Sequence, residues 1–281
     1  MNSFVAIHLT ARVYRLPVLL TEHEVASWLW GRLCRGFSAA LAAVIMPNHI
    51  HLVTAPENPG AALLRLGSII SGLRRSNNPA APDAWEPAAP PELVPDAKHL
   101  RRLVRYLALN PCRARLVDDP LGWPWSTHRD VIGAIAEPWV DAARVAAALG
   151  LTARGFAQAH HAYVSAAGSV CVTGTPFPRP AAPSQIAARP LEALVAAAAA
   201  ASRATPADVG RRSATRALFL QLAGRHGWRD APRLAELCGA SRRAIRWNLG
   251  RADGAGLDAA ELCLGDERLR RWAAPRTARR A

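Results

Sequence analysis

The sequence predicts an α+β fold, in which an antiparallel sheet backed by helices precedes a small all-helical domain. Two observations predict it. Strand-like alternation and helix-like periodicity occur in the order strand, helix, strand, strand, helix, helix over residues 4–109. After residue 190, every periodic segment has the pattern of a helix.

The elements of the first half are separated by recognisable turn and cap residues. They are one or two strands over residues 4–18, a helix over 21–37, strands over 38–46 and 49–54, and helices over 59–76 and 96–109. Thr21 and Glu24 have the spacing of a capping box at the start of the first helix. A Pro47-Asn48 turn separates the two short strands, and the last helix ends before Pro111.

The second half is helical throughout. The predicted helices cover residues 190–204, 206–211, 213–226, 231–238 and 241–249, and the closing residues 268–280 read as a frayed basic tail. Gly239 lies between two short helices and Ser241 caps the second, as in a helix-turn-helix, although an ordinary helical hairpin has the same pattern.

Composition divides the chain into three parts. Residues 1–134 form the first predicted domain, and residues 135–189 form a connecting segment with a proline-rich linker. Residues 190–281 form a helical, basic domain; from residue 186 onward the chain holds 18 basic and 9 acidic residues. Two domains also agree with a length of 281 residues.

Overall composition excludes several classes of protein. With 51% hydrophobic and 20% charged residues the chain is too apolar for a disordered tail, and its apolar runs are shorter than the roughly 20 residues that span a bilayer. The first residues lack the layout of a secretory signal, so we expect a cytoplasmic protein without membrane association. Five scattered cysteines without a CxxC pair are expected to be reduced.

The charge points to a polyanionic partner. The chain holds 35 basic residues against 21 acidic ones, which gives a formal net charge of +14. Nucleic acid is therefore the expected partner.

Two histidines on a predicted strand form the sharpest local motif. Side chains alternate between the faces of a strand, so His49 and His51 lie on one face while Ile50 lies on the other. Imidazoles side by side are suited to a divalent metal. Two polar residues on the solvated face of a half-buried sheet would give the same pattern.

The helix from His99 to Pro111 carries a second polar motif. Its apolar residues define a core face, and beside that face His99, Arg102, Tyr106 and Asn110 form a polar stripe. Tyr106 and Asn110 are one turn apart, so the phenol and the amide share a face. A surface tyrosine packed on a neighbouring leucine is the alternative.

These two segments belong to a longer series of motifs. Residues 47–51 read Pro-Asn-His-Ile-His, residues 106–111 read Tyr-x-x-x-Asn-Pro, residues 112–117 are basic and apolar, and residues 123–126 read Trp-Pro-Trp-Ser. In this order and spacing, residues 1–134 resemble the single-tyrosine HUH transposases, in particular the REP-associated tyrosine transposases.

The resemblance implies a ferredoxin-like HUH nuclease fold and a bacterial, nucleoid-associated transposase that cleaves and rejoins single-stranded, hairpin-associated DNA. It implies that Tyr106 attacks a phosphodiester and forms a 5′-phosphotyrosine intermediate. It also implies that His49, His51 and Asn110 bind a divalent metal, Mg²⁺ or Mn²⁺. A phenol is a weak nucleophile at neutral pH, so charge stabilisation by the metal would supply much of the rate. A homodimer is compatible with this reading.

Several basic residues are candidates for DNA contacts, with a solvated face as the alternative for each. They are His99, Arg102, Arg105, Arg74 and Arg75 near the tyrosine, and Arg242, Arg243 and Arg246 on the second helix of the predicted helix-turn-helix. Trp123 and Trp125 are candidates for stacking on an unpaired base, but a role in packing is the preferred interpretation.

One departure from the family pattern follows Trp85. The family has an aromatic, basic, strand-like stretch there, whereas this chain has the proline-rich sequence of residues 86–96. Because proline removes ladder donors, we expect an edge strand that is shortened or lost.

Three functions remain open from the sequence. The first is the metal-dependent strand-transferase, and the second is a catalytically inactive, domesticated transposase that acts as a DNA-binding regulator. The third is a phosphodiesterase in which water replaces Tyr106 as the nucleophile. The presence of His49, His51, Tyr106 and Asn110 together favours the strand-transferase.

Overall fold

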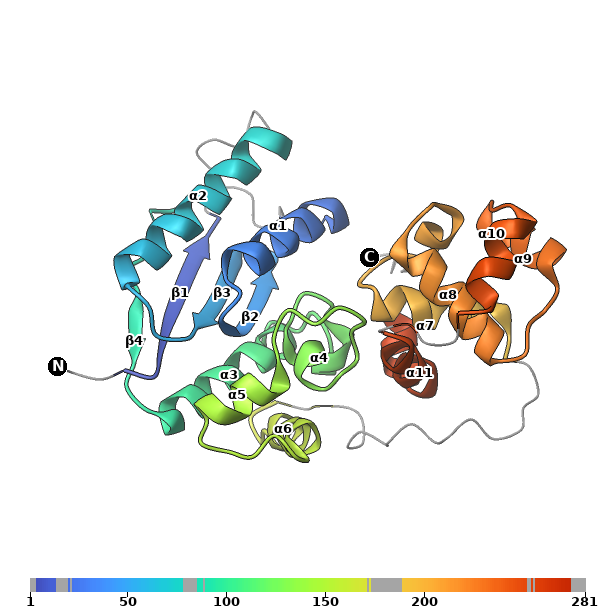
Figure 1. Cartoon of the computed structure of the whole chain (residues 1–281). Coiled ribbons are helices and arrows are strands. Elements are labelled where there is room, and N and C mark those ends of the chain that lie inside the picture. Colours follow the sequence, from blue (N-terminus) through green and yellow to red (C-terminus); the bar gives the residue numbers. More distant parts are fainter. Residues whose placement is uncertain are drawn as a thin grey trace. The chain divides into compact units, whose positions relative to one another are not determined.

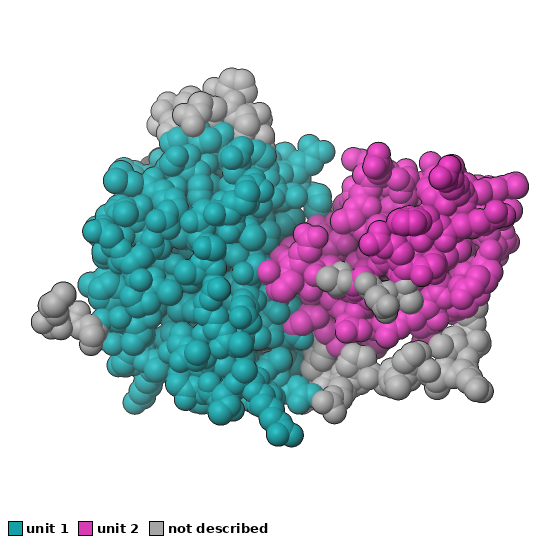
Figure 2. Space-filling model, viewed as in Figure 1, with its two compact units in different colours: residues 1–132, 139–172 teal, residues 133–138, 173–281 magenta. Residues whose placement is uncertain are grey.

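The computed structural model describes most of the chain (Figure 1). The described residues are 4–13, 20, 22–77, 85–87, 89–170, 172, 189–251, 254 and 256–273, without the side chains of residues 74–77. They fall into two compact units (Figure 2): unit 1 comprises residues 1–132 and 139–172, and unit 2 comprises residues 133–138 and 173–281.

Unit 1 contains the predicted ferredoxin-like fold. Its elements follow the order βαββαβ, and its strands form one antiparallel sheet in the order β2-β3-β1-β4. The elements are β1 (Ala6–Arg12), α1 (His23–Gly36), β2 (Ala40–Met46), β3 (His49–Thr54), α2 (Pro59–Asn77) and β4 (Glu92–Val94). The α+β fold class is thereby confirmed.

The two faces of the sheet differ in character. Ile7, Leu9, Ile50 and Leu52 are fully buried and belong to the same core as the apolar residues of α1 and α2. The other face carries polar side chains near its middle. Helix α3 (Ala97–Arg113) contacts this polar face, which places the residues of α3 beside those of β3.

Two element boundaries in unit 1 differ from the predicted ones. Helix α1 begins at His23 with Glu22 at the N-cap and without a side-chain cap bond, and Thr21 lies outside the described residues. Helix α3 does not end before Pro111 but continues to Arg113. Near a helix end a proline removes only one intrahelical bond, and the Ala114 amide still donates to the Asn110 carbonyl.

The fourth strand was not predicted as an element. Strand β4 is three residues long and pairs antiparallel with β1, with Glu92 opposite His8. Three residues beside prolines carry too little alternation to be recognised, and the pairing partner is about 85 residues away in sequence. The expected shortening of the edge strand is consistent with this length.

Unit 1 continues beyond the segment expected to end it at residue 134. Its later elements are η2 (Pro120–Gly122), α4 (His128–Val131), α5 (Ala142–Ala148) and α6 (Phe156–Ser165). Trp139, Val145 and Phe156 are buried in the core of the sheet unit, so the segment expected to connect two domains contains two helices of unit 1.

Trp123 and Trp125 are packing residues. Both are buried, and the Trp123 indole N–H donates to the Ile45 carbonyl at 2.8 Å. The Trp125 ring lies 6.1 Å from the Trp30 ring, between centroids. Neither ring is exposed enough to stack on a base, so the preferred interpretation of the sequence is confirmed.

Unit 2 is all-helical, as predicted. Its elements are α7 (Leu191–Ala201), η3 (Pro206–Gly210), α8 (Ala214–Arg225), α9 (Ala231–Cys238), α10 (Arg242–Leu249), α11 (Leu257–Gly265) and α12 (Glu267–Ala273). Helices α9 and α10 are joined through Gly239, which has a φ of 58°, and the Ser241 side chain accepts from the Ala244 amide at 3.3 Å. This is the predicted arrangement of two short helices.

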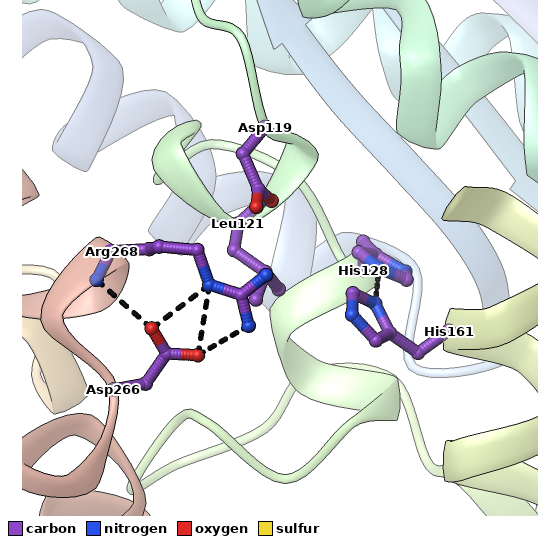
Figure 3. A network of polar contacts seen from close by, with 6 residues as sticks. All are labelled: Asp119, Leu121, His128, His161, Asp266 and Arg268. Carbon is purple, nitrogen blue, oxygen red and sulfur yellow. Dashed lines mark hydrogen bonds and ion pairs between the residues drawn. The ribbon is translucent and has the colours of Figure 1, made fainter. Parts of the chain in front are cut away.

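The last helix corrects the prediction of a frayed tail. Helix α12 includes residues 268–273 of that segment, and its Leu269 is fully buried. Asp266 accepts from the Arg268 backbone amide at 2.9 Å and pairs with its guanidinium (Figure 3). The rest of the predicted tail, most of the proline-rich linker and Cys171 lie outside the described residues.

Two further expectations concern the described chain as a whole. Cys112 and Cys238 are free thiols. In the part of the chain that the structure describes, no helix has both the length and the apolar character needed to cross a membrane.

Candidate active site

The two predicted histidines lie side by side on β3. In the register of the sheet, His49 is opposite Arg12 and His51 is opposite Thr10, so the two histidines share one face with these residues of β1. The centroids of the two imidazole rings are 4.9 Å apart, and the rings are nearly perpendicular. The predicted pairing of the imidazoles is therefore present in the structure.

His49 is held from both sides of its ring. Its Nδ1 lies 2.7 Å from Asn48 Oδ1, and its Nε2 lies 3.5 Å from Asn110 Nδ2. Because Asn48 Oδ1 is an acceptor, Nδ1 carries the proton and Nε2 carries the lone pair. Burial, and after it the charge of Arg12, lowers the pKa of His49.

His51 is the more deeply buried imidazole. Burial lowers its pKa to about 3, and the neighbouring His49, His8 and Arg12 act in the same direction. Its Nδ1 lies 3.1 Å from His8 Nε2. Both imidazoles of β3 are thus neutral at neutral pH, the form that binds metals.

Tyr106 faces these imidazoles from α3. The centroid of its ring is 6.0 Å from that of His51, with the two rings edge to face, and 42% of the residue is exposed. The Arg113 guanidinium carbon lies 4.9 Å from the centroid of the Tyr106 ring. The ring is therefore both adjacent to the histidine pair and accessible to a partner from solution.

The donor groups at this site fit a divalent metal. His49 and His51 are neutral, and the Asn110 side chain is buried beside His49 Nε2. Turning the Asn110 amide over would present its oxygen, a ligand suited to Mg²⁺ or Mn²⁺. Among the described residues no group of three or more His, Cys, Asp or Glu side chains could hold a metal ion.

The predicted DNA contacts near Tyr106 have different surroundings. Arg102 is exposed, and His99 Nε2 lies 3.8 Å from Glu92 Oε1. The Arg105 guanidinium instead lies 4.3 Å from the centroid of the Tyr163 ring on α6, which favours a packing role over a phosphate contact. The side chains of Arg74 and Arg75 lie outside the described residues.

Unit 2 presents the other predicted contacts on α10. Arg242, Arg243 and Arg246 are all exposed. Trp247 on the same helix is 66% exposed, and together with Ser241, Arg243 and Ala244 it lines an open hollow. The Arg251 guanidinium carbon lies 5.5 Å from the centroid of the Trp247 ring.

Three residues of these two sites were not predicted from the sequence. His8 could have been found, because His8, Thr10 and Arg12 alternate with apolar residues along β1 and so share a face. Trp247 could have been found as a large aromatic between basic residues of one helix. Glu92 carries no such signal, because it joins the site through a short, non-local strand.

No protein-family model matches this sequence, and no curated protein matches it. A solved structure is similar. It is described as the structure of the REP-associated tyrosine transposase bound to a REP hairpin. It is 24% identical, the alignment covers 47% of this chain and 83% of that one, and the TM-score is 0.39.

Proposed function

We propose that this chain is a metal-dependent tyrosine transposase, a DNA strand-transferase that cleaves and rejoins single-stranded, hairpin-associated DNA. One observation carries the proposal. The exposed ring of Tyr106 lies edge-on to His51, while Asn110, one turn later on α3, lies against His49. A phenol beside two neutral imidazoles and an amide is suited to metal-assisted phosphoryl transfer to a tyrosine.

In the proposed reaction, the Tyr106 phenolic oxygen attacks the phosphorus of a phosphodiester. A bond forms between this oxygen and phosphorus, and the bond from phosphorus to the 3′-oxygen of the preceding nucleotide breaks. The phenolic proton passes to solvent, to which the ring is exposed, and the departing oxygen takes up a proton to become a 3′-hydroxyl. Attack by that hydroxyl on the 5′-phosphotyrosine reverses the reaction and rejoins strands.

His49, His51 and Asn110 are the residues that would hold the metal. A divalent ion bound there supplies charge stabilisation for the phosphoryl oxygens as the phenol attacks. The contribution of the chain itself is orientation. Asn48 fixes the ring of His49, and α3 presents Tyr106 and Asn110 on the same face.

The exposed side chains of α10 in the second unit support the same function. Three exposed arginines on α10 provide positive charge, and the exposed Trp247 provides a surface on which a base would stack. We infer that α10 contacts the DNA on which Tyr106 acts.

The proposal is tested with single-stranded oligonucleotides that carry hairpins of varied sequence and a label at the 3′ end. With Mn²⁺ present, the label should remain on the full-length protein through denaturation, because the 5′-phosphate of the labelled fragment becomes linked to Tyr106. Tyr106→Phe should abolish the labelled adduct and keep DNA binding.

A matched control is Tyr163→Phe, which removes a phenolic oxygen from the same unit at a ring whose centroid lies 4.3 Å from the guanidinium carbons of Arg101 and Arg105. This variant should still form the adduct. Binding without cleavage would favour the inactive, DNA-binding regulator. Cleavage without an adduct, retained in Tyr106→Phe, would favour water as the nucleophile.

A further inference from the structure

A chain of hydrogen bonds leads from the edge of the sheet to His51. Glu92 Oε2 on β4 lies 3.0 Å from His8 Nδ1, and His8 Nε2 on β1 lies 3.1 Å from His51 Nδ1. His8 is 8% exposed, and its ring is stacked on that of His51 with centroids 5.2 Å apart. Neither His8 nor Glu92 has a part in the reaction proposed above.

We propose that Glu92 and His8 are positioning residues that fix the ring orientation and the tautomer of His51, so that His51 Nε2 presents a lone pair to the metal. The inference rests on the proposed function for the identity of the ligand. The hydrogen-bonded chain itself is independent of the reaction.

The direction of each bond follows from the groups at the end of the chain. An ionised carboxylate accepts only, so His8 Nδ1 donates to Glu92. In a neutral ring, His8 Nε2 then carries a lone pair and accepts from His51 Nδ1–H. The Nε2 atom of His51 is left as the unprotonated nitrogen, which is the atom able to coordinate a metal.

The two histidines of β3 are thereby oriented in the same way. His49 donates its Nδ1–H to Asn48 directly, whereas His51 donates its Nδ1–H to a carboxylate through the ring of His8. A hydrogen bond from the other ring nitrogen fixes the tautomer and orientation of metal-binding histidines in general. Glu92 is the third residue of the hydrogen-bonded chain, and the fold positions it, because the pairing of β4 with β1 places Glu92 directly opposite His8.

The first measurement is the tautomer of His51 in the metal-free, full-length protein. With selectively ¹⁵N-labelled histidine at neutral pH, and the signals assigned by a His51→Asn variant, we expect His51 to be protonated at Nδ1. In His8→Leu, which removes the acceptor from a buried position, this preference should be lost. An Nε2-protonated His51 in the parent protein would overturn the inference.

The second measurement is Mn²⁺ affinity by calorimetry, in the absence of DNA. His8→Leu should weaken binding by about 10–100-fold. His8→Gln should restore most of the affinity, because its side-chain oxygen can accept from His51 Nδ1–H. Thr10→Val, a change on the same face of β1 opposite His51, is the matched control and should bind Mn²⁺ as the parent does. Equal affinity in His8→Leu and the parent would contradict the inference.

These readouts separate the two proposals. Formation of a Tyr106 adduct by a protein whose His51 is protonated at Nε2 would leave the proposed function standing and remove the role of His8. The expected tautomer and Mn²⁺ response in a protein that forms no adduct would support the role of His8 and contradict the strand-transferase.

Discussion

At the scale of single residues, the account depends on four side chains from two elements. Their identities were predictable, because the alternation of β3 places His49 and His51 on one face and the helical period places Tyr106 one turn before Asn110. Periodicity alone did not predict their closeness across elements, which arises from the packing of α3 on the sheet; the resemblance of the motifs implied it. The distance of 6.0 Å between the centroids of the Tyr106 and His51 rings is set by tertiary packing.

Asn110 gives a prediction for metal binding. Asn110→Ala should weaken Mn²⁺ binding by about 10-fold or more, because it removes the only oxygen donor among the proposed ligands. Asn110→Asp keeps an oxygen at the same place and should retain binding. Calorimetry on the DNA-free protein measures both. If Asn110→Ala bound Mn²⁺ as tightly as the parent, the amide would have no part in the ligand set.

At the scale of elements, helices α4 and α6 are joined by buried histidines. His128 Nε2 lies 3.0 Å from His161 Nδ1 (Figure 3), and His160 stacks on Phe156. Burial, with His160 and His161 nearby, lowers the pKa of His128 well below its usual range. Burial, His161 and Arg101 lower the pKa of His160 to about 4.

This cluster should make unit 1 less stable in acid. Histidine in the unfolded chain has a pKa near 6.5, whereas burial lowers the pKa of native His160 to about 4. Between these two pH values the unfolded chain therefore binds a proton that the native chain does not bind. The free energy of unfolding should therefore fall by about 2 kcal/mol between pH 7 and pH 5 from His160 alone. Urea unfolding followed by tryptophan fluorescence measures it, and six of the nine tryptophans belong to unit 1.

The control for the acid effect is His160→Phe, which keeps an aromatic ring beside Phe156 and removes the titrating group. Its stability should depend less steeply on pH over the same range. An unchanged pH dependence in this variant would show that His160 does not contribute.

Helix α10 gives a prediction about the kind of DNA bound. Trp247→Ala should weaken binding of single-stranded DNA by about 5–150-fold, because base stacking on an exposed aromatic contributes about 1–3 kcal/mol. Trp247→Phe should keep much of the affinity. Fluorescence anisotropy with a labelled strand measures the change. Equal losses for single strands and for a perfect duplex would argue against stacking.

Element boundaries and pairing were the least predictable part of the fold. The predicted order of strands and helices holds for the first three strands, but β4 is too short to recognise, and Pro111 lies inside α3 where it was expected to end it. Both differences have a tertiary origin. Strand β4 forms because it pairs with β1. Helix α3 continues past Pro111 because, in its last turn, the missing N–H of the proline removes only one hydrogen bond of the helix.

At the scale of the whole molecule, the dominant property is the net charge of +14. Binding to a polyanion should release counterions, so the logarithm of the affinity for DNA should fall linearly with the logarithm of salt concentration. Replacing Arg243 and Arg246 together by alanine should reduce the slope for a single strand by about 1.4, which is about 0.7 for each phosphate that is no longer neutralised.

The matched control removes the same charge elsewhere. Arg211 and Arg271 are exposed arginines that pair with Asp208 and Glu267, respectively. Replacing both by alanine should leave the slope close to that of the parent. If the two double variants gave the same slope, only net charge would matter and α10 would make no specific contact with DNA.

The most direct test of the central claim is the chemical identity of the residue that becomes linked to DNA. After reaction with Mn²⁺ and a hairpin-containing strand, nuclease and trypsin digestion should leave a nucleotide on the peptide of residues 106–113, which follows Arg105 and ends at Arg113. Mass spectrometry should place the phosphate on Tyr106. A nucleotide on any other peptide, or cleaved DNA with no modified peptide, would contradict the account.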